Sequence, residues 1–471
     1  MIYMRRKRVF FVAALLSLTL WAQMLVPDEV AQAEFEGQTD ATETILIQIV
    51  EHLSLFEYDQ AIVLFDEITY PYRDSSQLRL LEASVLSSAG KFDEARVIVE
   101  NISVQEPENT DALHILAAIE SVLGRTRQQQ TALERIISIE PENAEALVAL
   151  GNIQLANRNI RQGAGFFHRA LTAEPENMGA LLGLGRAFRM NREWEDAEQY
   201  YSQAVQLYPD NAEARTERAR FYRGRQHLIL ALEDLNEAKR IEPNDYWTAI
   251  DRGNLLLEMN RRAPALEEFN RAIEINPGEF LAYVYSAGLK DEFGDLDGAM
   301  SDYETLSRLR PDYYFAFEGL GLHKMRTGQW EEARNAFTEA YRRAQNEHLY
   351  ALLAAICWMR LEDITAPRAF IGQMFNRVPR DTLQWYMFRL FHDLTVRNFQ
   401  GETDMLIRID SETNDTLKAQ MLFYMAMYYE VRGNPNVANR YLLMAYELNA
   451  RSIPEFRLID WILTDRNIKP F

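Results

Sequence analysis

The chain has 471 residues and a formal net charge of −20, with 70 acidic side chains against 50 lysines and arginines. Its charged fraction of 25% and hydrophobic fraction of 48% are ordinary, so the chain can bury a core and is not disordered by composition. Sequence-independent nucleic-acid binding depends on neutralising phosphates with basic side chains. Because the chain is strongly acidic, we do not expect nucleic acid to be its partner.

The first 33 residues are predicted to be an export signal. A basic stretch, "RRKR", precedes an apolar run from Val9 to Leu20, and the small-x-small site "AQA" ends at Ala33. An uncleaved membrane anchor stays open as the alternative, because the apolar stretch extends to Val26 and reaches about 18 residues, near the lower limit for a bilayer span. In that case membrane contact is expected only through residues 9–26. A short linker is predicted over residues 34–41.

From residue 42 onward the chain repeats one phrase every 34 residues. The clearest mark is a proline at that interval: Pro107, Pro141, Pro175, Pro209, Pro243, Pro277 and Pro311, with Pro379 in the same frame. A strict period of this length indicates stacked copies of one supersecondary unit. With the proline set as position thirty-two, the frame predicts ten units over residues 42–381, a divergent unit over 382–418 and a last unit over 419–452.

Each unit is predicted to hold two helices, here called helix A and helix B. Small residues recur at positions eight and twenty, as at Gly151 and Gly163, and a large apolar residue recurs at position twenty-four, as at Phe167. Small residues let two helix axes approach closely, and a large neighbour fills the space beside them. The predicted N-caps of helix A are Asn109, Asn143, Asn177, Asn211 and Asp245. Left-handed residues that end helix A are predicted at Gly90, Gly124, Gly294 and Gly328.

This pattern resembles the tetratricopeptide repeat family over residues 42–452. The resemblance implies an all-α fold, namely a right-handed α-solenoid superhelix of about twelve tandem helix pairs, with helix A lining a concave groove. Residues 453–471 are predicted to form a capping helix and tail, because the end of a repeat array must be covered.

No catalytic residue, metal site or cofactor is predicted. The seven histidines are scattered, and no HExxH, CxxC or GxSxG arrangement occurs. The nearest match to a phosphate loop is "GLG" at Gly183–Gly185, which we interpret as close helix packing because it lies within a predicted helix A. Cys357 is the only cysteine and forms no internal disulfide. The chain is therefore expected not to be an enzyme, with a non-catalytic module of a cell-wall enzyme complex as a remote alternative.

Positions two, five, nine and twelve of helix A are spaced three, four and three residues apart, so they form one stripe along each helix. The resemblance implies that this A-helix stripe faces the groove. In three successive units the stripe holds polar candidates for partner binding: Asn152, Arg186, Arg189, Arg220 and Arg223. Two interpretations stay open: a site for an anion or acidic peptide, and a solvated face or local pairing with Glu213, Glu217 and Asp251.

In the following units the A-helix stripe becomes apolar, with Asn254 among its members. The apolar members are Trp247, Ile250, Leu257, Leu281, Val284, Phe315, Leu322, Met325, Leu349, Leu352, Ile356 and Met359. A dozen apolar side chains in one stripe need a cover. A partner segment or the chain's own residues 453–471 could supply it, and the sequence leaves both open.

These features predict an exported scaffold or adaptor that binds an unidentified protein or peptide in its groove, in the periplasm of a bacterial-type cell envelope. The alternative is an assembly factor anchored in the inner membrane, with its repeats facing the periplasm.

Overall fold

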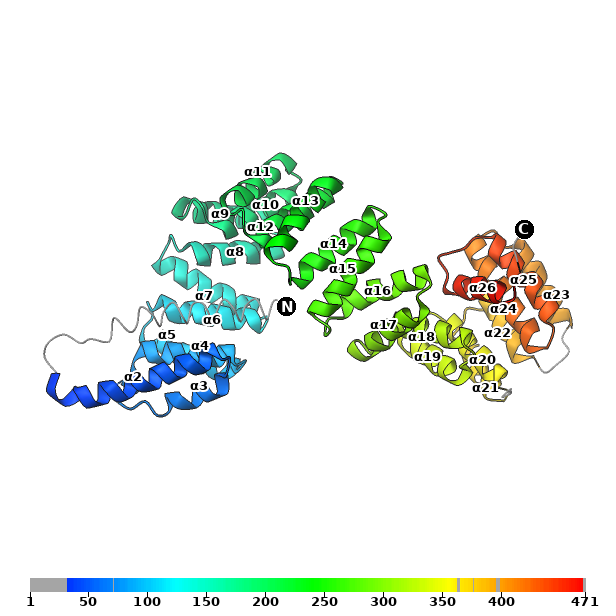
Figure 1. Ribbon diagram of the computed structural model, residues 1–471, viewed down its shortest axis with the longest axis horizontal. Coiled ribbons are helices and arrows are strands. Elements are labelled where there is room, and N and C mark those ends of the chain that lie inside the picture. Colours follow the sequence, from blue (N-terminus) through cyan, green and yellow to red (C-terminus); the bar gives the residue numbers. More distant parts are fainter. Residues whose placement is uncertain (1–31, 71, 362–364, 376, 395–398, 469–471) are drawn as a thin grey trace. The chain divides into compact units, whose positions relative to one another are not determined.

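All regular structure in the described part of the chain is helical. The computed structural model describes residues 32–70, 72–361, 365–375, 377–394 and 399–468. These residues form 25 α-helices and one 3-10 helix, without a strand among them (Figure 1). The predicted all-α class is thereby confirmed. Most of the predicted export segment lies outside the described residues, and no described helix is long and apolar enough to cross a membrane.

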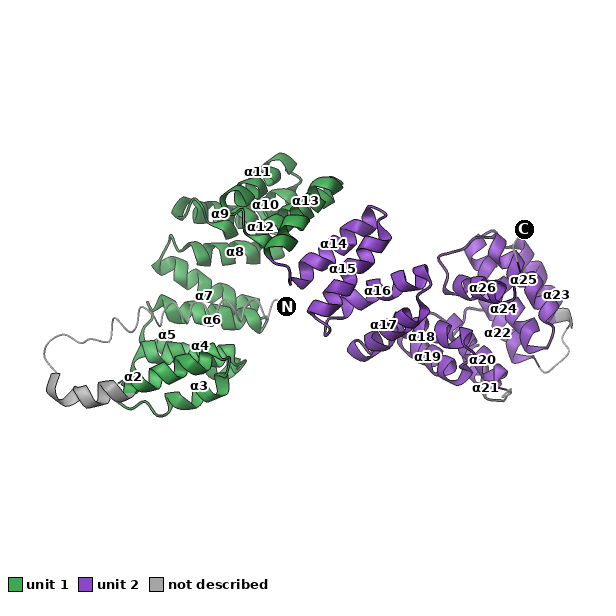
Figure 2. Ribbon diagram, viewed as in Figure 1, with its two compact units in different colours: residues 1–241 green, residues 242–471 purple. Residues whose placement is uncertain are grey.

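The chain divides into two compact units, residues 1–241 and 242–471, which we call unit 1 and unit 2 (Figure 2). In unit 1 each α-helix packs against the next along the chain. The helices of unit 1 are α2 (Gln32–Ser54), α3 (Tyr58–Phe65), the 3-10 helix η1 (Tyr72–Asp74), α4 (Ser76–Ser88), α5 (Phe92–Gln105), α6 (Thr110–Val122), α7 (Thr126–Ile139), α8 (Ala144–Ala156), α9 (Ile160–Ala173), α10 (Met178–Asn191), α11 (Trp194–Leu207), α12 (Ala212–Gly224) and α13 (Leu228–Ile241).

Unit 2 continues the same succession of packed helices and adds contacts between helices far apart in the sequence. Its helices are α14 (Tyr246–Glu258), α15 (Arg262–Ile275), α16 (Phe280–Phe293), α17 (Leu296–Leu309), α18 (Tyr314–Arg326), α19 (Trp330–Arg343), α20 (Leu349–Arg360), α21 (Thr365–Met374), α22 (Leu383–His392), α23 (Phe399–Ser411), α24 (Asp415–Val431), α25 (Pro435–Glu447) and α26 (Pro454–Asp465). The last helix, α26, packs against α18 as well as against α24 and α25.

These bounds place two helices in each predicted 34-residue unit, with two differences from the sequence prediction. The predicted linker over 34–41 is wrong, because α2 begins at Gln32 and includes it. No proline occurs between Pro27 and Pro71 to stop a helix there. At the other end of the array, α24 begins at Asp415, inside the predicted divergent unit.

The small and large positions fit together as predicted. A Cβ added to Gly151 in α8 would lie 2.6 Å from the ring of Phe167 in α9, and a Cβ added to Gly185 would lie 2.8 Å from the ring of Tyr201. Any side chain there would collide with an aromatic ring of the same unit. The glycines of the "GLG" stretch are therefore packing positions between helices, as interpreted from the sequence.

The predicted helix starts are confirmed in detail. At each of the five predicted N-caps the side-chain oxygen accepts a hydrogen bond from the backbone N–H three residues later, as from Ala146 to Asn143 at 2.9 Å. Such a bond satisfies one of the donors that a helix start leaves unpaired. The repeated asparagine thus fixes where each helix A begins.

The predicted left-handed turn after helix A is also present, and it does not depend on glycine. Gly90, Gly124, Gly294 and Gly328 have φ between 70° and 84°. In the intervening units the same position is left-handed with other residues: Phe56, Arg158, Arg192, Gln226 and Asn260. The geometry of the repeat therefore imposes positive φ even where the residue carries a Cβ, which costs conformational energy.

Candidate functional site

The predicted arginine cluster of unit 1 is joined by acidic and amide side chains. Arg186 in α10 donates to Asn152 Oδ1 in α8 at 3.1 Å and lies 3.9 Å from Glu217 in α12. Arg220 lies 3.0 Å from the same glutamate. Of the other two arginines in this cluster, Arg189 in α10 is exposed and Arg223 in α12 is half-buried. These contacts match the local pairing with Glu217 that the sequence left open.

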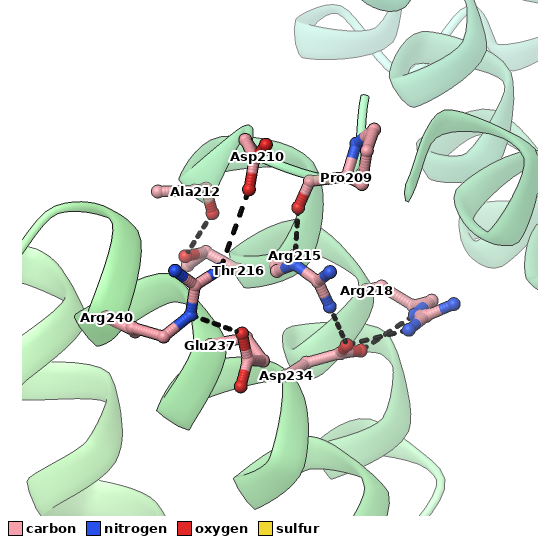
Figure 3. A network of polar contacts seen from close by, with 9 residues as sticks. All are labelled: Pro209, Asp210, Ala212, Arg215, Thr216, Arg218, Asp234, Glu237 and Arg240. Atoms are coloured by element: carbon pink, nitrogen blue, oxygen red, sulfur yellow. Dashed lines mark hydrogen bonds and ion pairs between the residues drawn. The ribbon is translucent and has the colours of Figure 1, made fainter. Parts of the chain in front are cut away.

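Helices α12 and α13 are held together by a second arginine cluster, which the stripe analysis did not include (Figure 3). Arg218 donates through Nε and Nη2 to the two carboxylate oxygens of Asp234, both at 2.7 Å, and Arg215 lies 3.6 Å from Asp234 Oδ1. Asp234 is 3% exposed. The cluster closes a helix pair within one repeat, so its role is structural.

In unit 2 the first members of the apolar stripe are accessible. Trp247 in α14 is 36% exposed and Phe315 in α18 is 45% exposed. Leu281 and Val284 in α16 are half-buried. We call these four residues the open part of the stripe. Asn254 is half-buried nearby along α14, whereas Ile250 is only 2% exposed and is unavailable to a partner, contrary to its predicted role.

The later members of the stripe are covered by the chain itself. Leu322 and Met325 in α18 are 0% and 5% exposed, so their predicted role in partner contact is wrong for this conformation. They belong to one hydrophobic cluster with three side chains of α26, namely Leu458, Ile459 and Leu463. The same cluster contains Leu352, Ile356 and Met359 of α20. Helix α26 of the C-terminal tail packs against α18, whereas α20 packs against α24. The tail is therefore the cover over Leu322 and Met325, and we call these five stripe residues the covered part.

A buried polar network fastens α26 over α16 and α18. Arg457 Nη1 donates to Asp291 Oδ2 at 2.6 Å, and its Nη2 donates to Glu318 Oε1 at 3.1 Å. Asp291 also pairs with His323 Nε2 at 2.5 Å and accepts from the Tyr303 hydroxyl at 2.7 Å. The side chains of Asp291 and Glu318 are 5% and 8% exposed. One guanidinium of the tail therefore compensates two carboxylates buried in the helix A layer.

Further hydrogen bonds tie the start of α26 to α24. Tyr424 donates its hydroxyl hydrogen to Glu455 Oε1 at 2.8 Å, and Gln420 Nε2 donates to Glu455 Oε2 at 3.1 Å. Tyr350 of α20 donates to the second oxygen of Glu318. All four oxygens of the two glutamates thus have a partner, as buried carboxylates require.

The carboxyl groups of this network have shifted pKa values in opposite directions. Burial pushes the pKa of Asp291 upward, but His323, Arg457 and Tyr303 together outweigh burial and hold that pKa below its ordinary value. Burial raises the pKa of Glu318 despite the hydrogen bond from Tyr350. Burial also raises the pKa of Glu455 despite the bond from Tyr424. Among these three carboxyl groups, Asp291 is therefore the one whose charged form the protein stabilises.

The far end of α26 borders a cavity of about 200 Å³. Trp461 lies with its ring centroid 5.3 Å from that of His323, and the Arg326 guanidinium lies 4.8 Å from the Trp461 ring. Glu430 accepts from Arg466 at 2.9 Å on the same wall. Apolar side chains and paired charges therefore line this cavity between α26 and the helices it covers.

Sequence reasoning did not identify Asp291, Glu318 or Arg457. Asp291 and Glu318 occupy positions twelve and five of their units, so both belong to the A-helix stripe. Two acidic residues within an otherwise apolar stripe were a usable signal, since buried carboxylates need a cation. The tail offers Arg457 between the apolar Phe456 and Leu458.

Two observations concern metal binding and thiol chemistry in the described part of the chain. No three or more His, Cys, Asp or Glu side chains among them are placed to hold a metal ion. Cys357 is buried, and burial raises its pKa to about 12, so the thiol stays protonated and unreactive at neutral pH. The candidate site considered below is the open part of the stripe in unit 2.

Two parts of the chain match a known family model. Residues 148–212, 191–245 and 319–369 match the family model described as tetratricopeptide repeat. No curated protein matches the chain.

Several solved structures of low sequence identity are similar. A tetratricopeptide repeat protein from Parabacteroides merdae is 16% identical, with a TM-score of 0.45, covering 52% of this chain and 96% of its own. The Pseudomonas aeruginosa protein pilF is 22% identical, with a TM-score of 0.38, covering 43% of this chain and 92% of its own. YrrB, described as having an unusual peptide-binding site, is 21% identical, with a TM-score of 0.29, covering 39% of this chain and 95% of its own.

Proposed function

We propose that this chain, which is built of tandem tetratricopeptide repeats, is a scaffold that binds a protein partner along the open part of the stripe in unit 2. Repeats of this family generally bind proteins or peptides. The observation that carries the proposal is the exposure of Trp247 and Phe315 at equivalent stripe positions of α14 and α18. Large aromatic side chains left in water at a recurring position mark an interaction surface.

The covered part of the stripe supports this proposal and indicates the form of the partner. There the same face accepts an amphipathic helix, α26, through apolar side chains and one arginine. A face that packs one helix of the chain is suited to a similar helix from a partner, as in other helix-in-groove complexes. The partner segment is therefore expected to be helical, with apolar residues spaced three and four apart.

We further propose that the protein acts in a bacterial-type cell envelope, as an exported periplasmic scaffold. The support is the sequence before residue 34, with its basic stretch, apolar run and small-x-small site. N-terminal sequencing of the mature protein distinguishes this exported form from a membrane-anchored form of the same scaffold. A mature chain that begins after Ala33 supports export with cleavage, and one that keeps residues 9–26 supports the anchor.

The binding proposal is tested with the double variant W247S/F315S. Wild type and variant are each cross-linked in intact cells through a photoreactive residue at Val284, and cross-linked products are compared. We expect a discrete product with wild type and its loss in the variant, because the two aromatic anchors are gone.

The matched control is I229S/L230S, which removes two exposed apolar side chains of α13, 69% and 42% exposed. This control should keep the cross-link, and both variants should melt within about 2 °C of wild type, since exposed substitutions cost little. An identical product from W247S/F315S would contradict the proposal.

A further inference from the structure

The outer face of the first two repeats carries an apolar ridge that is separate from the A-helix stripe. Val63 in α3 and Val97 in α5 occupy position twenty-two of their units and are 61% and 58% exposed. Tyr70 and Val104 occupy position twenty-nine and are 76% and 79% exposed. We call these four residues the outer ridge.

The other repeats provide an internal comparison for the outer ridge. In the next seven units neither position is apolar. Position twenty-two holds Thr131, Gly165, Gln199, Glu233, Glu267, Ser301 and Asn335, and position twenty-nine holds Ser138, Thr172, Gln206, Arg240, Glu274, Arg308 and Arg342. All fourteen are exposed. The fold thus turns these positions toward solvent in all nine units compared, from residue 42 to residue 347, and among these nine the first two place apolar side chains there.

The two halves of the outer ridge lie on neighbouring helices. Lys91 Nζ, at the start of α5, lies 2.9 Å from Asp59 Oδ1 in the first turn of α3. Ile62 of α3 packs against the hydrophobic cluster that contains Ile98 and Val99 of α5. Val63 is the sequence neighbour of Ile62 and Val97 is the sequence neighbour of Ile98, so the two valines lie on adjoining parts of α3 and α5.

An acidic border surrounds the outer ridge. The side chains of Asp59, Asp66 and Asp93 are 81%, 81% and 87% exposed. Glu67 and Glu94 are exposed as well. Lys91 pairs with Asp59, Arg73 pairs with Asp66, and Arg125 lies 4.0 Å from Asp93. Residues 42–109 nevertheless hold thirteen acidic side chains against four lysines and arginines. The border therefore carries excess negative charge, which repels anionic lipid and nucleic acid.

We infer that the outer ridge is a second docking surface, for a protein segment whose apolar side chains are flanked by lysine or arginine. Apolar contact with Val63, Val97, Tyr70 and Val104 supplies the centre of the interface, and the acidic border selects a basic rim. This surface lies in unit 1 and shares no residue with the open part of the stripe. The chain thus has two faces through which a scaffold can hold two partners.

The test uses a synthetic 18-residue amphipathic helix as probe, with leucines on one face and lysines beside them. Fluorescence anisotropy with the full chain should give saturable binding that weakens as salt is raised. The variant V97S/V104S should bind at least tenfold more weakly. It copies serines that units of the same chain carry at these positions, so it is expected to fold.

Two controls make the result decisive. W247S/F315S should bind the probe like wild type, which separates this surface from the proposed stripe function. A probe with glutamates in place of lysines should not bind, whereas equal binding of both probes would overturn the inference. Undiminished binding by V97S/V104S, or no binding by wild type, would also overturn the inference. Binding to phosphatidylglycerol vesicles that V97S/V104S abolishes would overturn it in favour of a lipid surface. Self-association of the chain that V97S/V104S abolishes would overturn it in favour of a second copy of the chain.

Discussion

Asp234 in unit 1 and Asp291 in unit 2 are both buried carboxylates that receive an arginine, but the arginines come from different distances along the chain. Arg218 reaches Asp234 across 16 residues, within one repeat. Arg457 reaches Asp291 across 166 residues, from the last helix to the third helix of the same unit. Local pairs of the first kind close a repeat on itself. The pair between Arg457 and Asp291 instead attaches α26, a helix outside the repeats, to the A-helix stripe.

This difference separates two sources of stability in an array. A regular repeat is stabilised by contacts within itself and with its neighbours, so damage stays local. The α26 contact adds an interaction between elements that the repeat period does not relate. The predictions below test whether the two kinds of contact fail independently.

The largest effect is expected from deleting residues 453–471. The deletion uncovers Leu322 and Met325 of the covered part, which each lose up to about 1.5–3 kcal/mol of burial, and it leaves Asp291 and Glu318 without their guanidinium. We expect strong binding of a hydrophobic dye and aggregation at concentrations where wild type stays monomeric, measured by fluorescence and light scattering. Unchanged dye binding would show that α26 is not the cover.

A smaller effect is expected from the substitution R457M, which keeps the helix but removes its charge. Leaving two buried carboxylates uncompensated costs about 3 kcal/mol, the lower end for a broken buried pair because the Arg457 side chain is 32% exposed. Hydrogen exchange should show faster opening of α26, with α12 and α13 unchanged. Adding D291N and E318Q should restore part of the protection.

The matched substitution in unit 1 is R218M. It removes two bonds to Asp234, but Arg215 remains 3.6 Å away and can take over part of the pairing. We expect a loss of about 2 kcal/mol, seen as faster exchange in α12 and α13 only. R240M is the control, because its partners Glu237 and Asp210 are largely exposed, and it should have no measurable effect (Figure 3). Loosening of α26 by R218M would show that the two kinds of contact are coupled.

The pH dependence of α26 should distinguish its acidic partners from one another. The raised pKa values of Glu318 and Glu455 mean that burying them charged weakens folding at neutral pH, and protonation relieves this as pH falls. The lowered pKa of Asp291 contributes stability above its ordinary pKa that is lost on further acidification. Protection of α26 should therefore rise modestly from pH 7 to about 5 and fall below about pH 4. A steady decline from pH 7 downward would contradict these directions.

The smallest effects are expected at the left-handed turns of unit 1. R158G removes a Cβ from a residue with φ of 62°, and it should stabilise by up to about 1 kcal/mol. G124A is its counterpart, since a Cβ there meets nothing within 4 Å and only the backbone with φ of 70° resists it. It should destabilise by about 1 kcal/mol. Denaturant unfolding of the two variants should shift in opposite directions, and equal shifts would show that side-chain contacts decide these positions.

The repeated part of the fold was predictable because the same residue types recur at the same positions in successive units. Gly151 opposite Phe167, Asn143 as N-cap and Gly124 as turn residue recur in several copies, so a single departure such as Arg158 does not hide the pattern. The α26 contact was only half predictable. The apolar stripe indicated that a cover was needed, but the partner of Asp291 lies outside the periodic region, where no repeat supplies a second copy of the signal.

The candidate site shows the same limit. Trp247 and Phe315, both at position two, are exposed, whereas Leu322 and Met325, at positions nine and twelve, are buried in the cluster that includes α26. Stripe spacing places all four on one face of their helices and says nothing about what lies above them. Likewise, Arg186 and Arg220 pair with Glu217 because α10 and α12 place them close together. The sequence identified Glu217 as a possible partner but did not determine whether the pairing forms.

The separation of α26 along the chain from the helices it contacts has a consequence for synthesis. Translation proceeds at about 5–20 residues per second, so the 139 residues that separate Glu318 from Arg457 take roughly 7–28 s to emerge. During that interval the helices of unit 2 can pair with their neighbours, but Leu322 and Met325 are not covered by α26 and Asp291 lacks its arginine partner. Unit 1 passes through no such stage, since the arginines of Asp234 precede it on the nascent chain. The late repeats are therefore the stretch that a chaperone has reason to hold until the ribosome has released the last helix.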